Sequence, residues 1–346
     1  MKLLVTGGAG FIGSAFVRLM LAGDKVRELI NLDKLTYAGN LENLAPVAAD
    51  RRHRFVRGDI CDAALVDSLL ADSRPDAIVH FAAESHVDRS IFSPAPVFET
   101  NLRGTFVLLE AARRHRVPRF LQISTDEVYG SLPEPLEADE NFPLRPSSPY
   151  SASKAGADLL ALSYFTTYRF PVIVTRASNN YGPYQFPEKL IPLMIANALE
   201  GRPLPVYGDG GNVRDWLYVE DHCRALAALL ETGREGEIYN IGGNCALPNL
   251  EVVRKILRIT GRPETLIQFV ADRPGHDRRY ALCSRKVREH TGWFPEVDFE
   301  EGLRRTVAWY QANAGWVARV RSGEYQRYYE QNYLNREAEL ARLSGR

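Results

Sequence analysis

Apolar residues along the first half of the chain follow two alternating periods. Short apolar runs, typical of buried strands, are separated by longer segments in which apolar residues recur at helical spacing. The predicted strands are Lys2–Thr6, Glu28–Asp33, Arg54–Arg57, Asp76–Phe81, Arg119–Ser124 and Pro171–Arg176. The predicted helices are Phe11–Leu21, Ala63–Ala71, Val97–His115 and Ala152–Tyr168. This order predicts right-handed crossovers and an α/β fold, a Rossmann-type doubly wound parallel sheet with helices on both faces.

The pattern changes after about residue 180, where Gly- and Pro-rich turns become frequent. The segments predicted between these turns are the strands Leu204–Tyr207 and Ile267–Val270 and the helices Leu190–Leu199, Leu250–Thr260 and Phe299–Asn313. We expect a first domain over residues 1–180 and a smaller mixed α/β substrate lobe over residues 181–335. The two should interleave, because Glu237–Ile241 has the pattern of one more buried strand. The charged residues 336–346 are expected to fray.

Composition excludes several classes of protein. Lys plus Arg equal Asp plus Glu at 43 each, so no net field favours nucleic acid or an acidic membrane. The four cysteines are scattered without a Cys-x-x-Cys pair, which predicts neither a metal site nor a disulfide framework. No apolar run approaches about 20 residues, and the N-terminus lacks a signal-peptide pattern. We therefore expect a cytoplasmic protein.

A glycine motif follows the first strand. Gly7, Gly10 and Gly13 are spaced Gly-x-x-Gly-x-x-Gly around Phe11 and Ile12, which differs from the standard Gly-x-Gly-x-x-Gly. These glycines allow a tight turn, close approach of a pyrophosphate to the helix N-terminus, and close packing of helix on strand. The alternative is a glycine-rich turn that binds nothing.

A carboxylate at the end of the second strand favours the dinucleotide interpretation. Asp33 can accept hydrogen bonds from the ribose hydroxyls and repel a 2′-phosphate, which predicts NAD rather than NADP. The residues that follow the second and third strands are expected to line the adenosine side of this site: Lys34, Leu35, Thr36, Asp59 and Ile60.

Candidate acid–base chemistry follows the fifth strand. Thr125, Asp126 and Glu127 lie at a carboxyl edge of the sheet, where open α/β sheets bind ligands, although an Asp-Glu pair is more often an acidic loop or a helix cap. Tyr150 and Lys154 are four residues apart on one face of a predicted helix. A nearby ammonium would lower the pKa of the Tyr150 phenol and make it a base. Thr125 could hydrogen-bond the same substrate hydroxyl. The alternative for the Tyr–Lys pair is an ordinary surface contact.

These motifs resemble the extended short-chain dehydrogenase/reductase superfamily, from Met1 to about Asn335. Within it, the segments Thr125–Gly130, Ser178–Leu190 and Asp272–Tyr280 resemble the dTDP-glucose 4,6-dehydratases. Related decarboxylases and GDP-mannose dehydratases are similar but carry Thr-Ser-Glu, and epimerases usually lack both carboxylates. Asp126 is therefore the discriminating residue.

The resemblance implies conversion of dTDP-glucose to a 4-keto-6-deoxy sugar and water. Tyr150 would take the C4 hydroxyl proton while hydride moves to NAD. Glu127 would remove the C5 proton and Asp126 would protonate the leaving C6 hydroxyl, after which hydride returns to C6. Each acid–base residue would contribute roughly 10²–10⁴ in rate.

The resemblance also implies binding residues and an assembly. On the cofactor side they are Phe81, Ala82, Ala83, Glu84, Thr100, Tyr150, Lys154 and Asn180. On the substrate side they are Ser85, Thr125, Asn179, Glu188, Lys189, Leu190, Arg214, Asn249, Arg273 and His276. Helices Val97–His115 and Ala152–Tyr168 would form a four-helix homodimer interface.

Two rival functions remain open at this point. One is another sugar-nucleotide enzyme of the same fold: a UDP-sugar decarboxylase, an epimerase or a different 4,6-dehydratase. The other is a non-catalytic NAD-sensing module that binds a partner. The sequence also leaves open whether the base pocket takes thymine, uracil or cytosine.

Overall fold

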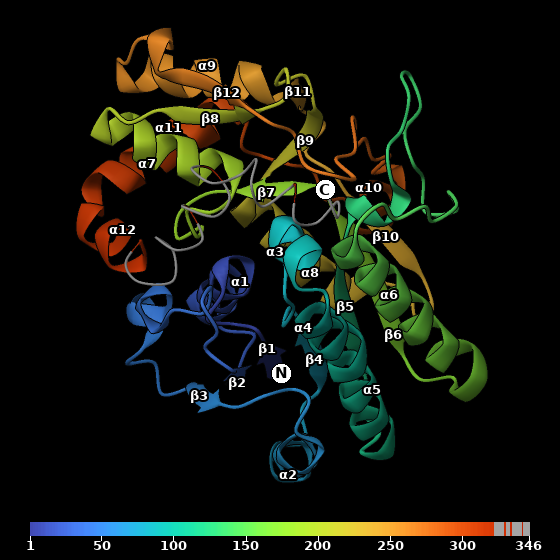
Figure 1. Ribbon diagram of the computed structural model, residues 1–346. Coiled ribbons are helices and arrows are strands. Elements are labelled where there is room, and N and C mark those ends of the chain that lie inside the picture. The colour runs from blue at the N-terminus through green and yellow to red at the C-terminus, as the bar shows by residue number, and fades with distance from the viewer. Residues whose placement is uncertain (322–328, 330–332, 334–340, 342–346) are drawn as a thin grey trace.

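A seven-stranded parallel sheet forms the centre of the protein. The computed structural model describes residues 1–321 together with Tyr329, Tyr333 and Ala341, so most of the predicted tail 336–346 lies outside the described residues. The strands are β1 (Lys2–Thr6), β2 (Glu28–Asp33), β3 (His53–Arg57), β4 (Ala77–His80), β5 (Phe120–Thr125), β6 (Val172–Ala177) and β10 (Ile238–Ile241). Their order is β10-β6-β5-β4-β1-β2-β3, with every pair parallel (Figure 1). The Rossmann-type sheet predicted from the sequence is confirmed.

Helices cover both faces of this sheet: α1 (Phe11–Ala22), α2 (Ala63–Ser73), α5 (Thr105–Arg114), α6 (Pro149–Tyr168), α8 (Val219–Thr232) and α10 (Arg285–Thr291). Successive side chains of a strand point to opposite faces. Leu3 and Val5 accordingly join a core cluster with α1 and α8, whereas Leu4 joins the cluster with α2 and α5. The sheet is thus buried on both sides.

The predicted helix Val97–His115 is not one regular helix. It consists of α4 (Ala95–Phe98), a π-helical segment over Glu99–Gly104, and α5. A Cβ at Gly104 would lie 2.5 Å from the Ile60 side chain, so glycine permits the close packing there. π-Helical turns are frequent at functional sites, and this one carries Thr100.

The smaller lobe has its own core and a mixed sheet. The strands β7 (Asn179–Tyr181), β9 (Val213–Tyr218) and β11 (Ala246–Pro248) form one sheet, with β9 parallel to β7 and antiparallel to β11. A parallel pair is formed by β8 (Leu204–Tyr207) and β12 (Ile267–Val270). The helices are α7 (Leu190–Glu200), α9 (Asn249–Thr260), α11 (Phe299–Ala312) and α12 (Ala314–Val320). Figure 1 shows this lobe above the carboxyl edge of the large sheet.

The chain crosses between the two parts more than once. After β9 it enters α8, which packs on α1, and then β10, which pairs with β6 at the edge of the large sheet. Later α10 packs on α8 and β10. The division into residues 1–180 and 181–335 remains a prediction, with these segments as its interleaved part.

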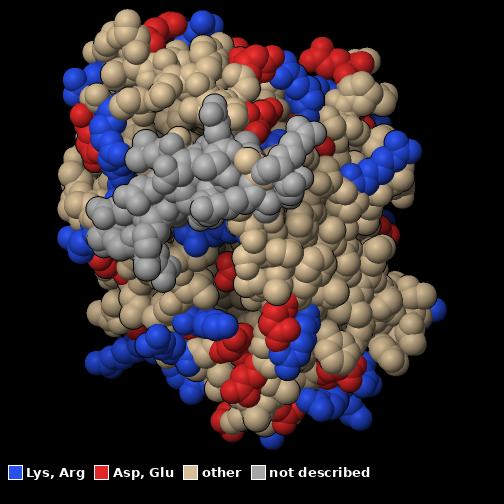
Figure 2. All heavy atoms as spheres, in the orientation of Figure 1, with Lys and Arg blue, Asp and Glu red and all other residues tan. Residues whose placement is uncertain are grey.

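The distribution of charged side chains on the surface agrees with the equal numbers of basic and acidic residues. Basic and acidic side chains are interspersed over the face drawn in Figure 2. Within the described part of the chain, no helix has both the length and the apolar character needed to cross a bilayer.

Candidate active site

A cavity of about 330 Å³ lies at the carboxyl edge of the large sheet. It is lined by the segments that directly follow β1, β2, β4, β5 and β6 and by residues of the smaller lobe. The strand order reverses between β1 and β4. Such a switch point is the expected ligand site of a doubly wound sheet.

The glycine motif forms one end of this cavity. Gly7 has φ +72°, and a Cβ there would lie 2.5 Å from the Ala82 backbone nitrogen. A Cβ at Gly13 would lie 2.3 Å from the Gly7 carbonyl oxygen. The predicted tight turn and close helix packing are therefore present, and the N-terminus of α1 opens into the cavity with Phe11 and Ile12 in its lining.

Asp33 lies beside this turn. Its Oδ2 accepts a hydrogen bond from the Ala9 backbone N–H at 2.9 Å, and its Oδ1 accepts from the Leu35 N–H at 2.8 Å. Each carboxylate oxygen has a second lone pair for a ligand hydroxyl. Lys34 forms an ion pair with Asp59 at 2.6 Å. Thr36 and Ile60 also line the cavity, but Leu35 does not.

The two adjacent carboxylates belong to a short 3-10 turn over Asp126–Tyr129 that follows β5 directly. Thr125 caps this turn, because its Oγ1 accepts a hydrogen bond from the Glu127 backbone N–H at 3.3 Å. The same hydroxyl donates to Asp126 Oδ1 at 3.2 Å. Thr125, Asp126 and Glu127 all line the cavity. The cap and the candidate acids are thus one local structure.

Asp126 is the more buried of the two acids, with 3% of its surface exposed. Burial raises the pKa of Asp126 well above its usual range, and the Glu127 carboxylate adds to the effect while Arg214 opposes it. Its Oδ2 is buried with no hydrogen-bond partner among the described residues. The arrangement favours a protonated carboxyl group that can donate to a molecule in the cavity.

Tyr150 and Lys154 also line the cavity, at the start of α6. The helix begins three residues earlier than predicted, because Ser148 and Ser151 form a capping box. The predicted effect of Lys154 on Tyr150 is wrong for this structure: burial and the Glu127 and Asp126 carboxylates raise the pKa of Tyr150, and a hydrogen bond with Thr125 only partly opposes them.

The reason lies in the position of the ammonium. Lys154 Nζ donates to the Ile123 carbonyl oxygen at 2.6 Å rather than to the phenol. Burial lowers the pKa of Lys154 to about 8, with Asp158 acting in the opposite direction. Lys154 therefore joins α6 to β5 and lies at the base of the site.

The cavity also gathers most of the other predicted residues. On the cofactor side its lining includes Phe81, Ala82, Ala83, Glu84, Thr100 and Asn180. On the substrate side it includes Ser85, Asn179, Glu188, Lys189 and Leu190. Lys189 connects the two parts of the protein, since its Nζ donates to the Ser85 carbonyl oxygen at 2.7 Å.

Four predicted substrate residues lie outside this lining: Arg214, Asn249, Arg273 and His276. Arg214 donates to the Asp277 carbonyl oxygen at 2.9 Å and stacks 4.2 Å from the Tyr280 ring centre. Its charge still acts on Asp126, as noted above. His276 faces Asp272, with Nδ1 2.6 Å from Oδ1.

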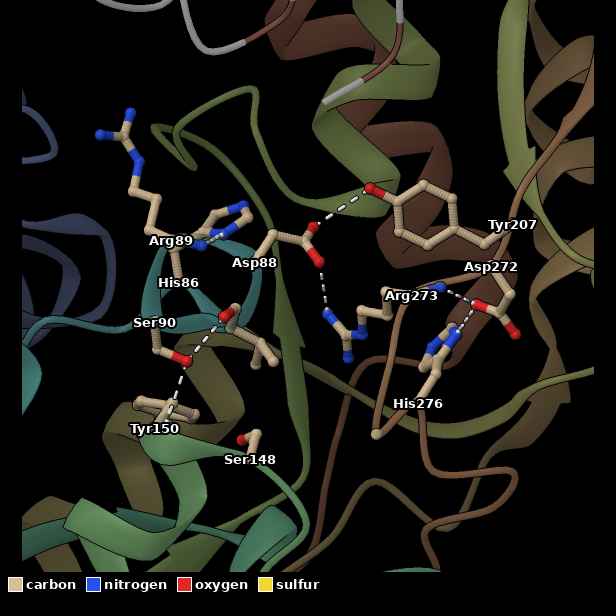
Figure 3. Close-up of polar contacts among 12 residues, drawn as sticks. His86, Asp88, Arg89, Ser90, Ser148, Tyr150, Tyr207, Asp272, Arg273 and His276 are labelled. Carbon is tan, nitrogen blue, oxygen red and sulfur yellow. Dashed lines mark hydrogen bonds and ion pairs between the residues drawn. The ribbon is translucent and has the colours of Figure 1, made fainter. Parts of the chain in front are cut away.

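A short helix that was not predicted, α3 (Val87–Phe92), connects Arg273 with α6. Asp88 on α3 is buried, accepts a hydrogen bond from the Tyr207 hydroxyl at 3.1 Å and lies 3.5 Å from Arg273 Nη1. On the same helix, Ser90 Oγ accepts from the Tyr150 backbone N–H at 3.2 Å. Figure 3 shows Asp88 pointing toward the smaller lobe and Ser90 toward Tyr150.

Comparison with known proteins agrees with this geometry. The family model described as GDP-mannose 4,6 dehydratase matches residues 4–306. A dTDP-glucose 4,6-dehydratase of Shigella flexneri is 53% identical over 97% of this chain and 100% of its own. The chain belongs to the dTDP-glucose 4,6-dehydratase family.

Solved structures give the same result. The crystal structure of the dTDP-glucose 4,6-dehydratase DesIV from Streptomyces venezuelae, with NAD bound, has a TM-score of 0.91 at 54% identity, covering 92% of this chain and 100% of that one. UDP-glucose 4-epimerase from Thermus thermophilus is more distant, with a TM-score of 0.84 at 36% identity, covering 90% and 100%. The chain thus shares its fold with epimerases but is closer in sequence to the dehydratases.

The dehydratase motifs did not reveal every polar residue of the cavity. Ser178, Gln185, Trp216 and His222 also line it. Ser178 and Gln185 lie within the motif segment Ser178–Leu190, so their position could have suggested a role. Trp216 and His222 lie in β9 and α8, and a single aromatic or histidine at such a place carries no periodic signal. No group of three or more His, Cys, Asp or Glu side chains suited to a metal ion occurs among the described residues.

Proposed function

We propose that this protein is an NAD-dependent dTDP-glucose 4,6-dehydratase, a hydro-lyase that converts dTDP-glucose to dTDP-4-keto-6-deoxyglucose and water. The observation that carries the proposal is the single cavity shared by the glycine turn, Asp33, Tyr150 and the Asp126–Glu127 pair. The high identity to dTDP-glucose 4,6-dehydratases over nearly the whole chain supports it.

The residues that follow β1, β2 and β4 fit a bound dinucleotide. A side chain at Gly7 or Gly13 would collide with backbone atoms, so glycine is required for the tight turn that leads into α1. The N-terminus of α1 opens into the cavity, where it would face a pyrophosphate. Asp33 would accept hydrogen bonds from the adenosine ribose and disfavour a 2′-phosphate. Thr100 and the Phe81–Glu84 segment would lie along the same molecule. NAD bound here would supply reversible hydride transfer, as the acceptor for the C4 hydride and the donor of that hydride to C6.

Tyr150 is the base for the C4 hydroxyl, with Thr125 hydrogen-bonded to the same group. The pKa of Tyr150 is raised in this structure, so it must fall before Tyr150 removes a proton. A cation beside the phenol, which an oxidised nicotinamide ring would supply, has this effect. Lys154, held on the Ile123 carbonyl, adds a second positive charge below the site when protonated.

The two carboxylates carry out the elimination. A ketone at C4 acidifies the C5 hydrogen, and Glu127 removes it. Asp126, kept protonated by burial, donates its proton to the departing C6 hydroxyl so that it leaves as water. Glu127 then returns a proton to C5. On the substrate side, Ser85, Asn179, Glu188, Lys189 and Leu190 would hold the sugar nucleotide, with Arg214, Asn249, Arg273 and His276 farther along it.

Incubation of the purified protein with dTDP-glucose tests the proposal. The 4-keto product absorbs in alkaline solution, and mass spectrometry should show the loss of one water. UDP-glucose and CDP-glucose in parallel reactions determine the base preference. Formation of dTDP-galactose without loss of water would indicate an epimerase instead. Binding of NAD with no conversion of any nucleotide sugar would favour the NAD-sensing module.

We also propose a cytoplasmic homodimer. The exposed side chains Phe98, Phe106 and Leu159 lie on α4, α5 and α6, and Phe98 and Phe106 line an apolar groove with Leu102 and Leu160. The only charged residues of the 20-residue α6 are Lys154 and Asp158, and both are buried. Two copies of these helices would cover each other's apolar surface as a four-helix interface. The four free cysteines fit a reducing compartment.

A further inference from the structure

His222 lies at the cavity without a role in the reaction described above. It is in the first turn of α8, immediately after β9, and is fully buried. Its ring contacts the side chain of Asn180, with Nδ1 2.9 Å from Asn180 Oδ1, and both residues line the cavity. A histidine at this position can therefore influence a bound molecule either through Asn180 or directly.

The hydrogen bonds of Asn180 determine the tautomer of His222. Asn180 Nδ2 donates to the Ser178 carbonyl oxygen at 2.9 Å, so the amide nitrogen faces Ser178 and the amide oxygen faces the histidine. An amide oxygen only accepts hydrogen bonds, which requires a proton on His222 Nδ1. In the neutral ring, Nε2 then carries a lone pair and acts as an acceptor.

His222 stays neutral in this environment. Burial lowers the pKa of His222 to about 3. The Nδ1–H tautomer is consequently the form present at neutral pH, and Asn180 is held in one orientation by two hydrogen bonds.

The other ring nitrogen lacks a partner. His222 Nε2 is buried and has no hydrogen-bond partner among the residues that the structure describes. A buried acceptor without a donor destabilises the folded protein. A donor on a molecule that enters the cavity would remove this destabilisation, so the atom indicates what kind of group binds there.

We propose that His222 is a positioning residue for Asn180 and that its Nε2 accepts a hydrogen bond from an N–H or O–H donor of a bound molecule, the carboxamide N–H of the nicotinamide being the first candidate and a hexose hydroxyl the second. This inference rests on the proposed function. Its specific content is that His222 recognises the reacting end of the ligand and not the adenosine end.

Two substitutions separate the two ring nitrogens. His222→Asn keeps an amide N–H close to the position of Nδ1 but has no atom at the position of Nε2. His222→Gln reaches the position of Nε2 with an amide but has no group at the position of Nδ1. The full chain, freed of nucleotide, is titrated with NAD and with ADP-ribose, which lacks only the nicotinamide. The thermal midpoint of each variant reports its folding.

The parent should bind NAD more tightly than ADP-ribose. We expect His222→Asn to lose about tenfold in affinity for NAD and nothing for ADP-ribose, as fits the loss of one hydrogen bond. His222→Gln should also bind NAD more weakly, because one of the two hydrogen bonds that hold the Asn180 side chain is lost. If His222→Asn binds NAD normally but its KM for dTDP-glucose rises about tenfold, the donor is the hexose hydroxyl.

Other results would overturn the inference. An equal loss of affinity for NAD and ADP-ribose would assign His222 a general structural role. Parent-like behaviour of His222→Asn toward both NAD and dTDP-glucose would show that Nε2 accepts no ligand donor. A parent protein that binds no NAD at all would instead refute the proposed function, so the two failures can be told apart.

Discussion

Asp126 and Glu127 are neighbours in sequence but have different environments. Asp126 is almost completely buried, and its pKa is raised first by burial and then by Glu127. A raised pKa in one member of a carboxylate pair is a common way to separate an acid from a base. The deeper burial of Asp126 therefore supports its proposed role as the acid.

We expect Asp126→Asn to slow the loss of water by roughly 10²–10⁴ while oxidation at C4 changes much less. Asparagine preserves the shape of the side chain but has no proton to give. Single-turnover measurements with dTDP-glucose, stopped by acid and analysed by mass spectrometry, follow the two steps separately. Asp72→Asn, at an exposed position of α2, is the matched control. Elimination at the parental rate in Asp126→Asn would contradict the assignment.

Glu188 gives a prediction about pH and stability. Burial raises the pKa of Glu188 from 4.5 to about 7, and Lys189 and Arg89 oppose the shift. The folded protein thus keeps Glu188 protonated at pH values where the unfolded chain has lost this proton. The associated stabilisation is complete below pH 4.5 and is lost as the pH rises through about 7.

The substitution Glu188→Gln removes this ionisation. We expect its free energy of unfolding, relative to the parent, to rise between about pH 5 and pH 8 by on the order of 1–3 kcal/mol. Thermal midpoints across this range check the trend, with exposed Glu137→Gln as the control. A difference between Glu188→Gln and the parent that does not vary with pH would be inconsistent with the raised pKa.

The motifs predict candidate catalytic residues but not the electrostatics of their surroundings. Tyr150 and Lys154 lie on one helix face as predicted, yet the ammonium faces the Ile123 carbonyl instead of the phenol. Helical spacing determines which residues share a face, whereas the direction of a long side chain depends on acceptors from other parts of the chain. His222 was missed for a related reason, since its partner Asn180 is 42 residues away.

At the scale of elements, α3 connects the smaller lobe to α6. Asp88 contacts Arg273 and Tyr207 of the lobe, and Ser90 contacts the backbone of Tyr150. A six-residue helix is too short for its apolar period to be recognised in the sequence. Longer elements such as α7, α9 and α11 were predicted to within about one residue at each end, because they show several turns of the pattern.

We expect Asp88→Asn to raise the KM for dTDP-glucose about tenfold with a smaller effect on kcat, because Arg273 loses its counter-charge and its orientation. Tyr207→Phe removes the hydrogen bond to Asp88 but keeps the Asp88 charge beside Arg273, so it should have a weaker effect. Steady-state kinetics on both variants provide the comparison. An unchanged KM in Asp88→Asn would show that Arg273 is oriented by other contacts.

The predicted helix Val97–His115 shows another limit of prediction from the sequence, because it contains a π-helical segment. The apolar pattern continues through Glu99–Gly104, so the sequence does not mark this segment as π-helical. In the structure, Gly104 packs on Ile60 and Thr100 lines the cavity. The apolar period predicts which face of a helix is buried. Whether a turn is wound as a π-helix depends on the elements that pack against it.

At the scale of the whole molecule, the uncharged face of α6 and the groove beside it predict self-association. In Figure 2 the surface in the region of α6 carries few charged side chains. Phe106 is 47% exposed on α5. We expect Phe106→Glu to place a charge in the interface and to shift the protein from dimer to monomer.

Light scattering at micromolar concentration measures this shift. Phe269→Glu is the matched control, because Phe269 is 56% exposed but lies on β12 in the other lobe. A monomeric parent, or a Phe106→Glu variant that keeps the mass of the parent dimer, would refute the proposed interface.

The position of β10 has a consequence for engineering hybrids of this family. Exchanging everything after residue 180 between two relatives would also exchange β10, which pairs with β6, and the helices α8 and α10 that pack beside it. The contacts of β10 with β6 and of α8 with α1 would then join side chains from two different sequences, and mismatched packing there would destabilise the large sheet. A chimera that exchanges only the stretches between these returning segments leaves the sheet intact.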